Sequence, residues 1–298
     1  MKTGWLTERE KIQKITTAFF AFSPLVLATL IFLALLLKAH PLLSLKSLPG
    51  LIFSSVWQPS RGHFGLWPFI LGTMWVTLTA FILAVPVSIL TSLYLSEYAP
   101  GRWKKLFQPV LDLLAGLPSV IYGMWGVLII VPIVGKYLAP LFGHQSSGFS
   151  ILAASLVLAV MILPTIISVS VEVLNSVPLA LKEAALSLGA TRFEVITRVV
   201  LKKAVPGIIA ACMLGLARAF GETIAVLMVV GNVPSIPHSL FSPAYPLPAL
   251  LANNYGEMMS IAGYESALNL AALLLLLIVL SFGILARWYL PRIKRRLG

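Results

Sequence analysis

The sequence has one cysteine, Cys212, and few charged residues. A single thiol excludes an intramolecular disulfide and a cysteine-rich metal cluster. Charged residues make up 11% of the chain, against about 25% in a soluble domain. The sequence also lacks a G-x-x-x-x-G-K-[ST] phosphate-binding loop, metal-ligand spacing among its histidines, and any serine–histidine–acid or paired-carboxylate arrangement. We therefore expect no cofactor, no metal, no ATP binding by a P-loop and no catalysis.

Apolar residues are abundant and fall in long runs, forming 59% of the chain. A helix needs about 20 of them to cross a bilayer core of roughly 30 Å. Six segments qualify: 15–37, 68–95, 110–135, 149–171, 204–231 and 264–287. Several prolines lie inside or beside these segments, which predicts kinked spans around a cavity or reflects ordinary membrane-helix composition. The sequence thus predicts an all-α membrane protein with a first span, 15–37, and a core, 68–287, within a transmembrane domain 15–298.

The basic residues predict how the spans are oriented. With the N-terminus in the cytoplasm, 17 of the 22 Lys and Arg residues fall on the cytoplasmic side and four on the outside. This asymmetry is the positive-inside pattern. We therefore expect a multi-pass protein of the cytoplasmic (inner) membrane with both termini in the cytoplasm. Anionic lipid accounts for the net charge of +12, so we expect no nucleic-acid partner.

Two further connections carry local signals. Residues 1–14 are predicted to form a cytoplasmic tail, where Thr7 and Glu10 have capping-box spacing and suggest a short interfacial helix. The predicted outer loop 232–263 contains five prolines and no Lys or Arg. Such a loop is stiff, and it either meets an extracytoplasmic partner or acts as a simple spacer.

The fourth connection reads as helix, turn and helix on the cytoplasmic side. Ser176 is expected to cap a first helix that has Pro178 in its first turn. Gly189 is expected to end that helix in a left-handed conformation. Thr191 and Glu194 then have the spacing of a capping box for a second helix. Two such helices form either a knob for a cytoplasmic partner or a cover for the inner mouth of the bundle.

The segment E-A-A-x-x-x-G at 183–189 resembles the EAA motif of bacterial ABC importer permeases. In that family an aliphatic residue and x-Leu-Pro follow the glycine. Here Val199 and Leu201 fit, but Lys202 replaces the usual proline. The resemblance implies a MetI-like permease bundle whose coupling loop, 175–203, docks on a separate ATPase. The residues to which it assigns this role are Glu183, Ala184, Ala185 and Gly189.

Other stretches resemble the phosphate-transport permeases of the Pst system, more the PstC type than the PstA type. They are 65–73, 95–98, 114–126, 217–226 and 230–232. The resemblance implies a transport subunit, not an enzyme, for import of inorganic phosphate. It implies a PstA-like sister permease, a PstB-like ATPase dimer and a PstS-like extracytoplasmic phosphate-binding protein. A permease for sulfate or molybdate, or a stand-alone secondary transporter, are the alternatives.

Two charges, Arg218 and Glu222, fall inside the predicted fifth span. Each costs about 2.5–3.5 kcal/mol on insertion scales, so such residues usually face a bundle interior or water. Their spacing of four predicts a shared helix face. A guanidinium suits a phosphate oxyanion, often through two hydrogen bonds. We expect either that Arg218 lines an anion pathway and Glu222 helps to hold or release the ion, or that the two form a structural ion pair.

Overall fold

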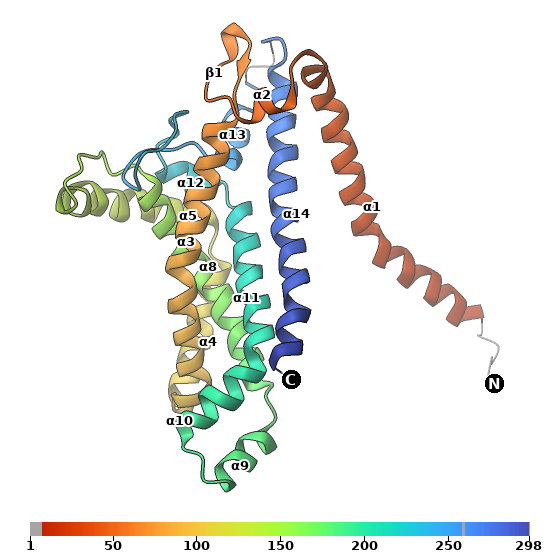
Figure 1. Ribbon diagram of the computed structural model, residues 1–298, viewed down its shortest axis with the longest axis vertical. Coiled ribbons are helices and arrows are strands. Elements are labelled where there is room, and N and C mark those ends of the chain that lie inside the picture. The colour runs from red at the N-terminus through yellow and green to blue at the C-terminus, as the bar shows by residue number, and fades with distance from the viewer. Residues whose placement is uncertain (1–7, 258–259, 298) are drawn as a thin grey trace.

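The computed structural model describes residues 8–257 and 260–297. This part of the chain contains six helices long and apolar enough to cross a membrane, which confirms the predicted six-span, helical class. They are Gln13–Leu45, Trp67–Tyr98, Ser119–Leu141, Ile151–Asn175, Arg192–Gly221 and Tyr264–Leu285. Figure 1 shows most of them packed in one bundle, with α9 at one end and β1 at the other. We call these the α9 end and the β1 end.

The elements follow one another in simple order. The α-helices are α1 (Glu8–Leu45), α2 (Leu48–Ile52), α3 (Trp67–Leu93), α4 (Gly101–Gly116), α5 (Ser119–Trp125), α6 (Val131–Ile133), α7 (Ala139–Leu141), α8 (Ile151–Asn175), α9 (Leu179–Ser187), α10 (Arg192–Glu194), α11 (Leu201–Gly221), α12 (Ile224–Val229), α13 (Leu247–Asn254) and α14 (Tyr264–Leu297). The π-helical segments are η2 (Tyr94–Tyr98), η3 (Gly126–Ile130), η4 (Val134–Leu138) and η5 (Val195–Val200). A small antiparallel hairpin pairs β1 (Trp57–Gln58) with β2 (His63–Phe64) across the 3₁₀ turn η1 (Pro59–Arg61).

Helices α3 and α8 pack closely against each other and run parallel. Ser155 Oγ donates to the carbonyl of Val76, and Ser96 Oγ donates to Asn175 Oδ1, both across 79 positions. This constant offset along both helices fixes their direction and register. The buried face of α3 and of η2, which continues it, carries a small residue at every fourth position: Ala80, Ala84, Ser88, Ser92 and Ser96. Small side chains let two membrane helices approach closely, so the pair packs along its full length.

The outer loop between α12 and α14 is a packed part of the β1 end. Its helix α13 buries Leu247 and Leu250 in a core cluster shared with α1, α3 and α14. The Leu247 amide donates to Thr73 Oγ1 at 2.8 Å, which fastens α13 to α3. The described residues of this loop therefore connect α12 to α14 and also form part of the core.

The third span starts later than the sequence predicts. Residues 110–116 belong to α4, an amphipathic helix in which Leu111 is buried while Leu113 is exposed. The chain then becomes extended at Leu117 and re-enters a helix at Ser119. Pro118 explains the break, because a proline disfavours helical backbone in the residue before it.

Helix α1 diverges from the bundle and contacts α14 toward the β1 end, where Lys38 Nζ lies 2.8 Å from Glu265 Oε1 (Figure 1). None of the most apolar window of α1 is buried within the described chain. The residues from Glu8 to Lys14 form the first turns of this helix. Thr7, the predicted cap of an interfacial helix, lies outside the described residues.

Candidate coupling loop and membrane arginine

The loop at the α9 end begins directly after α8. Helix α9 starts at Leu179 with Pro178 in the capping position. The predicted cap by Ser176 is wrong, because Ser176 Oγ donates instead to the carbonyl of Val173 at 2.7 Å. Ser176 thus completes the last turn of α8. Only the short segment 176–178 separates α8 from α9.

The turn between α9 and α10 follows its local sequence closely. Gly189 has a φ of +83°, the left-handed conformation expected from its position after the helix. The amide of Ala190 donates to the carbonyl of Ala185, and the amide of Gly189 donates to that of Leu186. These two bonds form the Schellman arrangement that satisfies free carbonyls at a helix end.

The second helix begins with the predicted capping box. The Glu194 amide donates to Thr191 Oγ1 at 3.3 Å, and the Thr191 amide donates to Glu194 Oε2 at 3.0 Å. The helix then continues through η5 into α11 as one apolar run, Arg192–Gly221. The loop is therefore continuous with the fifth span.

The outward surface of the loop is apolar. Leu188 is 89% exposed and Phe193 is 67% exposed, and Leu179, Leu181 and Leu186 are also exposed. Glu183, Ala184 and Gly189 lie on this exposed side, whereas Ala185 packs against the core of the bundle. The loop therefore exposes both the acidic residue and a set of apolar side chains, and Ala185 fastens it from within.

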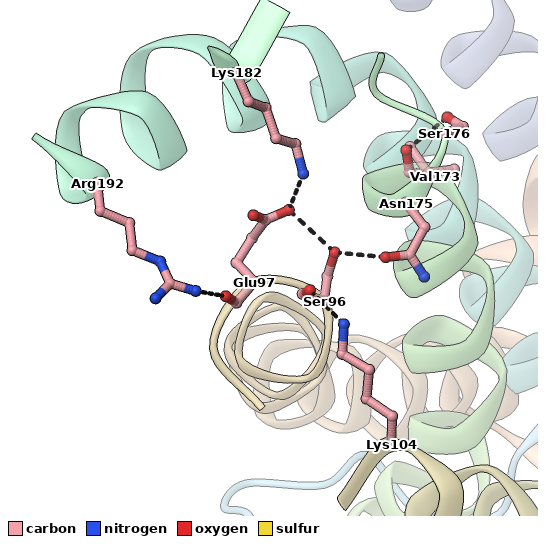
Figure 2. Close-up of polar contacts among 8 residues, drawn as sticks. All are labelled: Ser96, Glu97, Lys104, Val173, Asn175, Ser176, Lys182 and Arg192. Atoms are coloured by element: carbon pink, nitrogen blue, oxygen red, sulfur yellow. Dashed lines mark hydrogen bonds and ion pairs between the residues drawn. The ribbon is translucent and has the colours of Figure 1, made fainter. Parts of the chain in front are cut away.

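A polar cluster that sequence reasoning missed holds this loop against the end of α3. Figure 2 shows the Glu97 cluster, which consists of Ser96, Glu97, Lys104, Asn175, Lys182 and Arg192. Lys182 Nζ in α9 lies 2.7 Å from Glu97 Oε1, with side chains only 20% and 10% exposed. Arg192 in α10 donates to the Glu97 carbonyl and lies over the Tyr98 ring.

The neighbouring Ser96 connects two more helices to the same turn. Its hydroxyl donates to Asn175 at the end of α8, and its carbonyl accepts from Lys104 Nζ of α4 at 2.8 Å. Both Ser96 and Glu97 lie in the π-helical turn η2, closed by a bond from the Ala99 amide to the Tyr94 carbonyl. Four segments, α4, α8, α9 and α10, thus meet at one turn.

Arg218 lies near the end of α11 and contacts neutral partners. Its Nη1 donates to Thr165 Oγ1 at 2.7 Å, and its Nη2 donates to the Ala115 carbonyl at 3.4 Å. The predicted shared helix face with Glu222 is wrong, because α11 ends at Gly221 and Glu222 is extended. Glu222 Oε1 instead accepts from the Ala225 amide at the start of α12, and no ion pair joins the two charges within the described chain.

Six candidate spans in the described chain, with an exposed helical loop at one end, define a polytopic membrane-protein bundle. Residues 85–295 match the family described as binding-protein-dependent transport system inner membrane component. The chain belongs to this family, whose members are transport subunits.

Individual relatives extend the likeness over most of the chain. It is 38% identical over 240 residues to the probable ABC transporter permease protein YqgH of Bacillus subtilis, covering 80% of this chain and 76% of that one. It is 34% identical over 304 residues to the phosphate transport system permease protein PstC of Haemophilus influenzae, covering 97% and 95%. A chain of the inward-facing MetNI methionine ABC transporter superimposes with a TM-score of 0.54 at 19% identity, covering 76% and 94%. The predicted ABC importer permease fold is therefore confirmed.

Proposed function

We propose that the chain is the permease subunit of an ATP-driven importer of inorganic phosphate in the cytoplasmic membrane. The observation that carries the proposal is the likeness to PstC of Haemophilus influenzae along 97% of the chain, because it includes the spans and the loop together. The phosphate transport system permease protein PstC of Mesorhizobium japonicum is also similar, 37% identical over 261 residues. In this reading ATP hydrolysis belongs to a partner chain.

The chemistry of Arg218 supports an anionic cargo. A guanidinium within an apolar bundle is costly unless it is paired, bound to an anion or exposed to water. Arg218 has two neutral oxygen partners among the described residues, and its donors are only partly used. It can therefore offer further N–H groups to a phosphate oxygen. Glu222, beyond the break in the fifth span, is proposed to act in the same pathway by helping to hold or release the ion.

The loop 175–203 is proposed to couple this pathway to an ATPase dimer. Glu183, Ala184 and Gly189 supply the outward surface, with Ala185 anchoring the helix to the bundle. A single six-span chain with one such loop suits pairing with a sister permease, so that two loops meet two ATPase subunits. The β1 end, with its packed loop and hairpin, is proposed to receive an extracytoplasmic phosphate-binding protein.

The arrangement of the ends of the chain supports one orientation in the membrane. The start of α1, the end of α14 and α9 all lie toward one end of the structure (Figure 1). This end carries the basic stretches that the positive-inside pattern assigns to the cytoplasm. We therefore propose that both termini and the coupling loop are cytoplasmic.

Uptake of radiolabelled phosphate into proteoliposomes tests the function. The vesicles would contain this chain, its sister permease and the ATPase, with binding protein outside and ATP inside. We expect ATP-dependent uptake that excess sulfate and molybdate do not inhibit. Competition by either anion would contradict phosphate as the specific cargo. Uptake without ATP would contradict an ATP-driven importer and favour a secondary transporter.

Variants of Arg218 test the pathway in the same vesicles. Arg218→Ala should abolish uptake, while Arg218→Lys should retain part of it because the charge remains without the planar fork. Arg102→Ala is the matched control, since it removes an exposed guanidinium at the start of α4. Equal uptake by Arg218→Ala and Arg102→Ala would contradict a pathway role for Arg218.

A further inference from the structure

We propose that Glu97 is the positioning residue that ties the ATPase-docking loop to α3, so that loop movement displaces α3 and α8 together. This inference rests on the proposed function, because it assumes that the loop receives force from an ATPase.

One residue holds both helices of the loop. The Glu97 carboxylate pairs with Lys182 of α9, and its backbone carbonyl accepts from Arg192 of α10. Figure 2 shows the two contacts, and in the sequence Lys182 and Arg192 lie before and after the turn at Gly189. Fixing the loop at one point would leave it free to pivot, whereas contacts on both helices fix its orientation relative to η2.

The partial burial of the ion pair makes this attachment firmer than a surface pair. The Lys182 and Glu97 side chains are 20% and 10% exposed, so solvent screens them far less than a surface pair. By contrast, the Arg198–Glu194 pair in the same loop has an arginine that is 78% exposed and a longer separation of 3.5 Å. The Glu97 pair is therefore the one of these two whose loss should alter the position of the loop.

The attachment changes where a force on the loop is delivered. Without the Glu97 cluster, α9 connects to the bundle through residues 176–178, through α10 into α11, and through the packing of Ala185 against the core. With it, α9 is also joined to η2, which continues α3, and the span formed by α3 and η2 packs along α8 from Val76 to Ser96. A push on α9 then moves α3 and α8 as one body, which is the kind of rigid-body motion that alternates access in transporters.

The π-helical turn η2 allows Ser96 and Glu97 to contact residues of several helices. A π-helical turn inserts an extra residue and re-aims the side chains that follow it, and such turns are frequent at functional sites. Here it directs the Ser96 hydroxyl to Asn175 of α8 and the Glu97 carboxylate to α9. Lys104 of α4 closes the turn from the other side by bonding the Ser96 carbonyl.

The test compares phosphate imported per ATP hydrolysed in the proteoliposomes described above. Glu97→Gln removes the charge and keeps the shape, and Lys182→Gln removes its partner. We expect each to reduce the ratio at least about fivefold, the low end of coupling between linked sites. Glu172→Gln is the matched control, because it makes the same change on an exposed carboxylate at the same end of α8. Its ratio should equal that of the wild type.

A double variant separates this role from a general loss of stability. If the pair acts as a unit, Glu97→Gln with Lys182→Gln should be no worse than either single change. The exchange Glu97→Lys with Lys182→Glu should recover most of the ratio, which a merely unstable chain would not do. Copurification of the ATPase with each variant reports assembly separately.

The outcomes distinguish the two proposals. Absence of phosphate uptake by the wild-type complex would contradict the proposed function. Normal wild-type uptake, with unchanged ratios in Glu97→Gln and Lys182→Gln, would overturn the role of Glu97 and leave the function standing. Each single variant could lower the ratio, with the two fold reductions multiplying in the double variant. That result would also overturn the role of Glu97, because the free-energy effects of independent sites add.

Discussion

Replacing Gly189 with alanine should strain the turn between α9 and α10 without creating a clash. Gly189 has a φ of +83°, and a Cβ added there would meet no heavy atom within 4 Å. The cost therefore comes from the left-handed backbone alone, about 1–2 kcal/mol for a residue with a Cβ. That energy reduces the population of the native turn relative to competing conformations by a factor of roughly 5–30. The loop would then present its apolar surface in the docking orientation less often.

Gly143 provides a control with the same backbone conformation at a site away from the loop. Its φ is +73°, and a Cβ there would also meet nothing within 4 Å. Gly189→Ala and Gly143→Ala should therefore lower thermal stability to a similar extent, but only Gly189→Ala should reduce phosphate imported per ATP hydrolysed. Gly189→Asn should lie between the wild type and Gly189→Ala, because asparagine tolerates this region better.

Both readouts are needed to judge the result. Thermal unfolding in detergent measures the shared backbone cost, and proteoliposome uptake measures coupling. Equal losses of uptake per ATP in Gly189→Ala and Gly143→Ala would refute the reasoning, since the effect would then follow from stability alone. An unchanged ratio in Gly189→Ala, with the expected thermal loss, would show that docking does not depend on this turn.

Three further variants test local features of the same structure. Thr191→Ala should cost about 1 kcal/mol in thermal unfolding by removing the capping box, whereas Thr191→Ser should cost little; equal stability of the two would contradict the cap. Thr165→Val should lower phosphate uptake several-fold while leaving ATPase copurification intact, because the hydroxyl that orients Arg218 is lost; wild-type uptake would argue against that positioning. Gly148→Ala should cost about 3 kcal/mol or more, since its Cβ would collide with the Val131 carbonyl oxygen, and a loss near 1 kcal/mol would contradict the close packing.

Local chemistry explains most of what the sequence predicted correctly. Long apolar runs are sufficient to count six candidate spans, because bilayer thickness sets helix length. The turn at Gly189 and the cap at Thr191 were predictable because each depends on residues within three or four positions. The errors lie where two local signals compete. Pro178 takes the position that Ser176 was expected to fill, and Pro118 starts a span inside a longer apolar run.

The fifth span shows the limit of periodicity. The spacing of Arg218 and Glu222 implies one helix face only if the helix continues, and it stops at Gly221. A glycine inside an apolar run is common in membrane helices, so the sequence did not mark this one as an end. As a consequence, the Glu222 carboxylate accepts from the start of α12, and the Arg218 guanidinium has neutral partners.

The contacts of Glu97 could not be derived from sequence spacing, because its partner Lys182 is 85 positions away. Pairing across such a distance depends on the register of α3 against α8. Small residues fix this register, and such residues are common in membrane helices, so none of them predicts it alone. One signal was nevertheless present. Glu97 is one of only ten acidic residues, and it falls at the predicted cytoplasmic end of the second span, where the connections are basic. A single carboxylate among many basic residues is therefore a candidate for an ion pair that joins two segments. If such a carboxylate is partly buried, leaving its charge unpaired is costly.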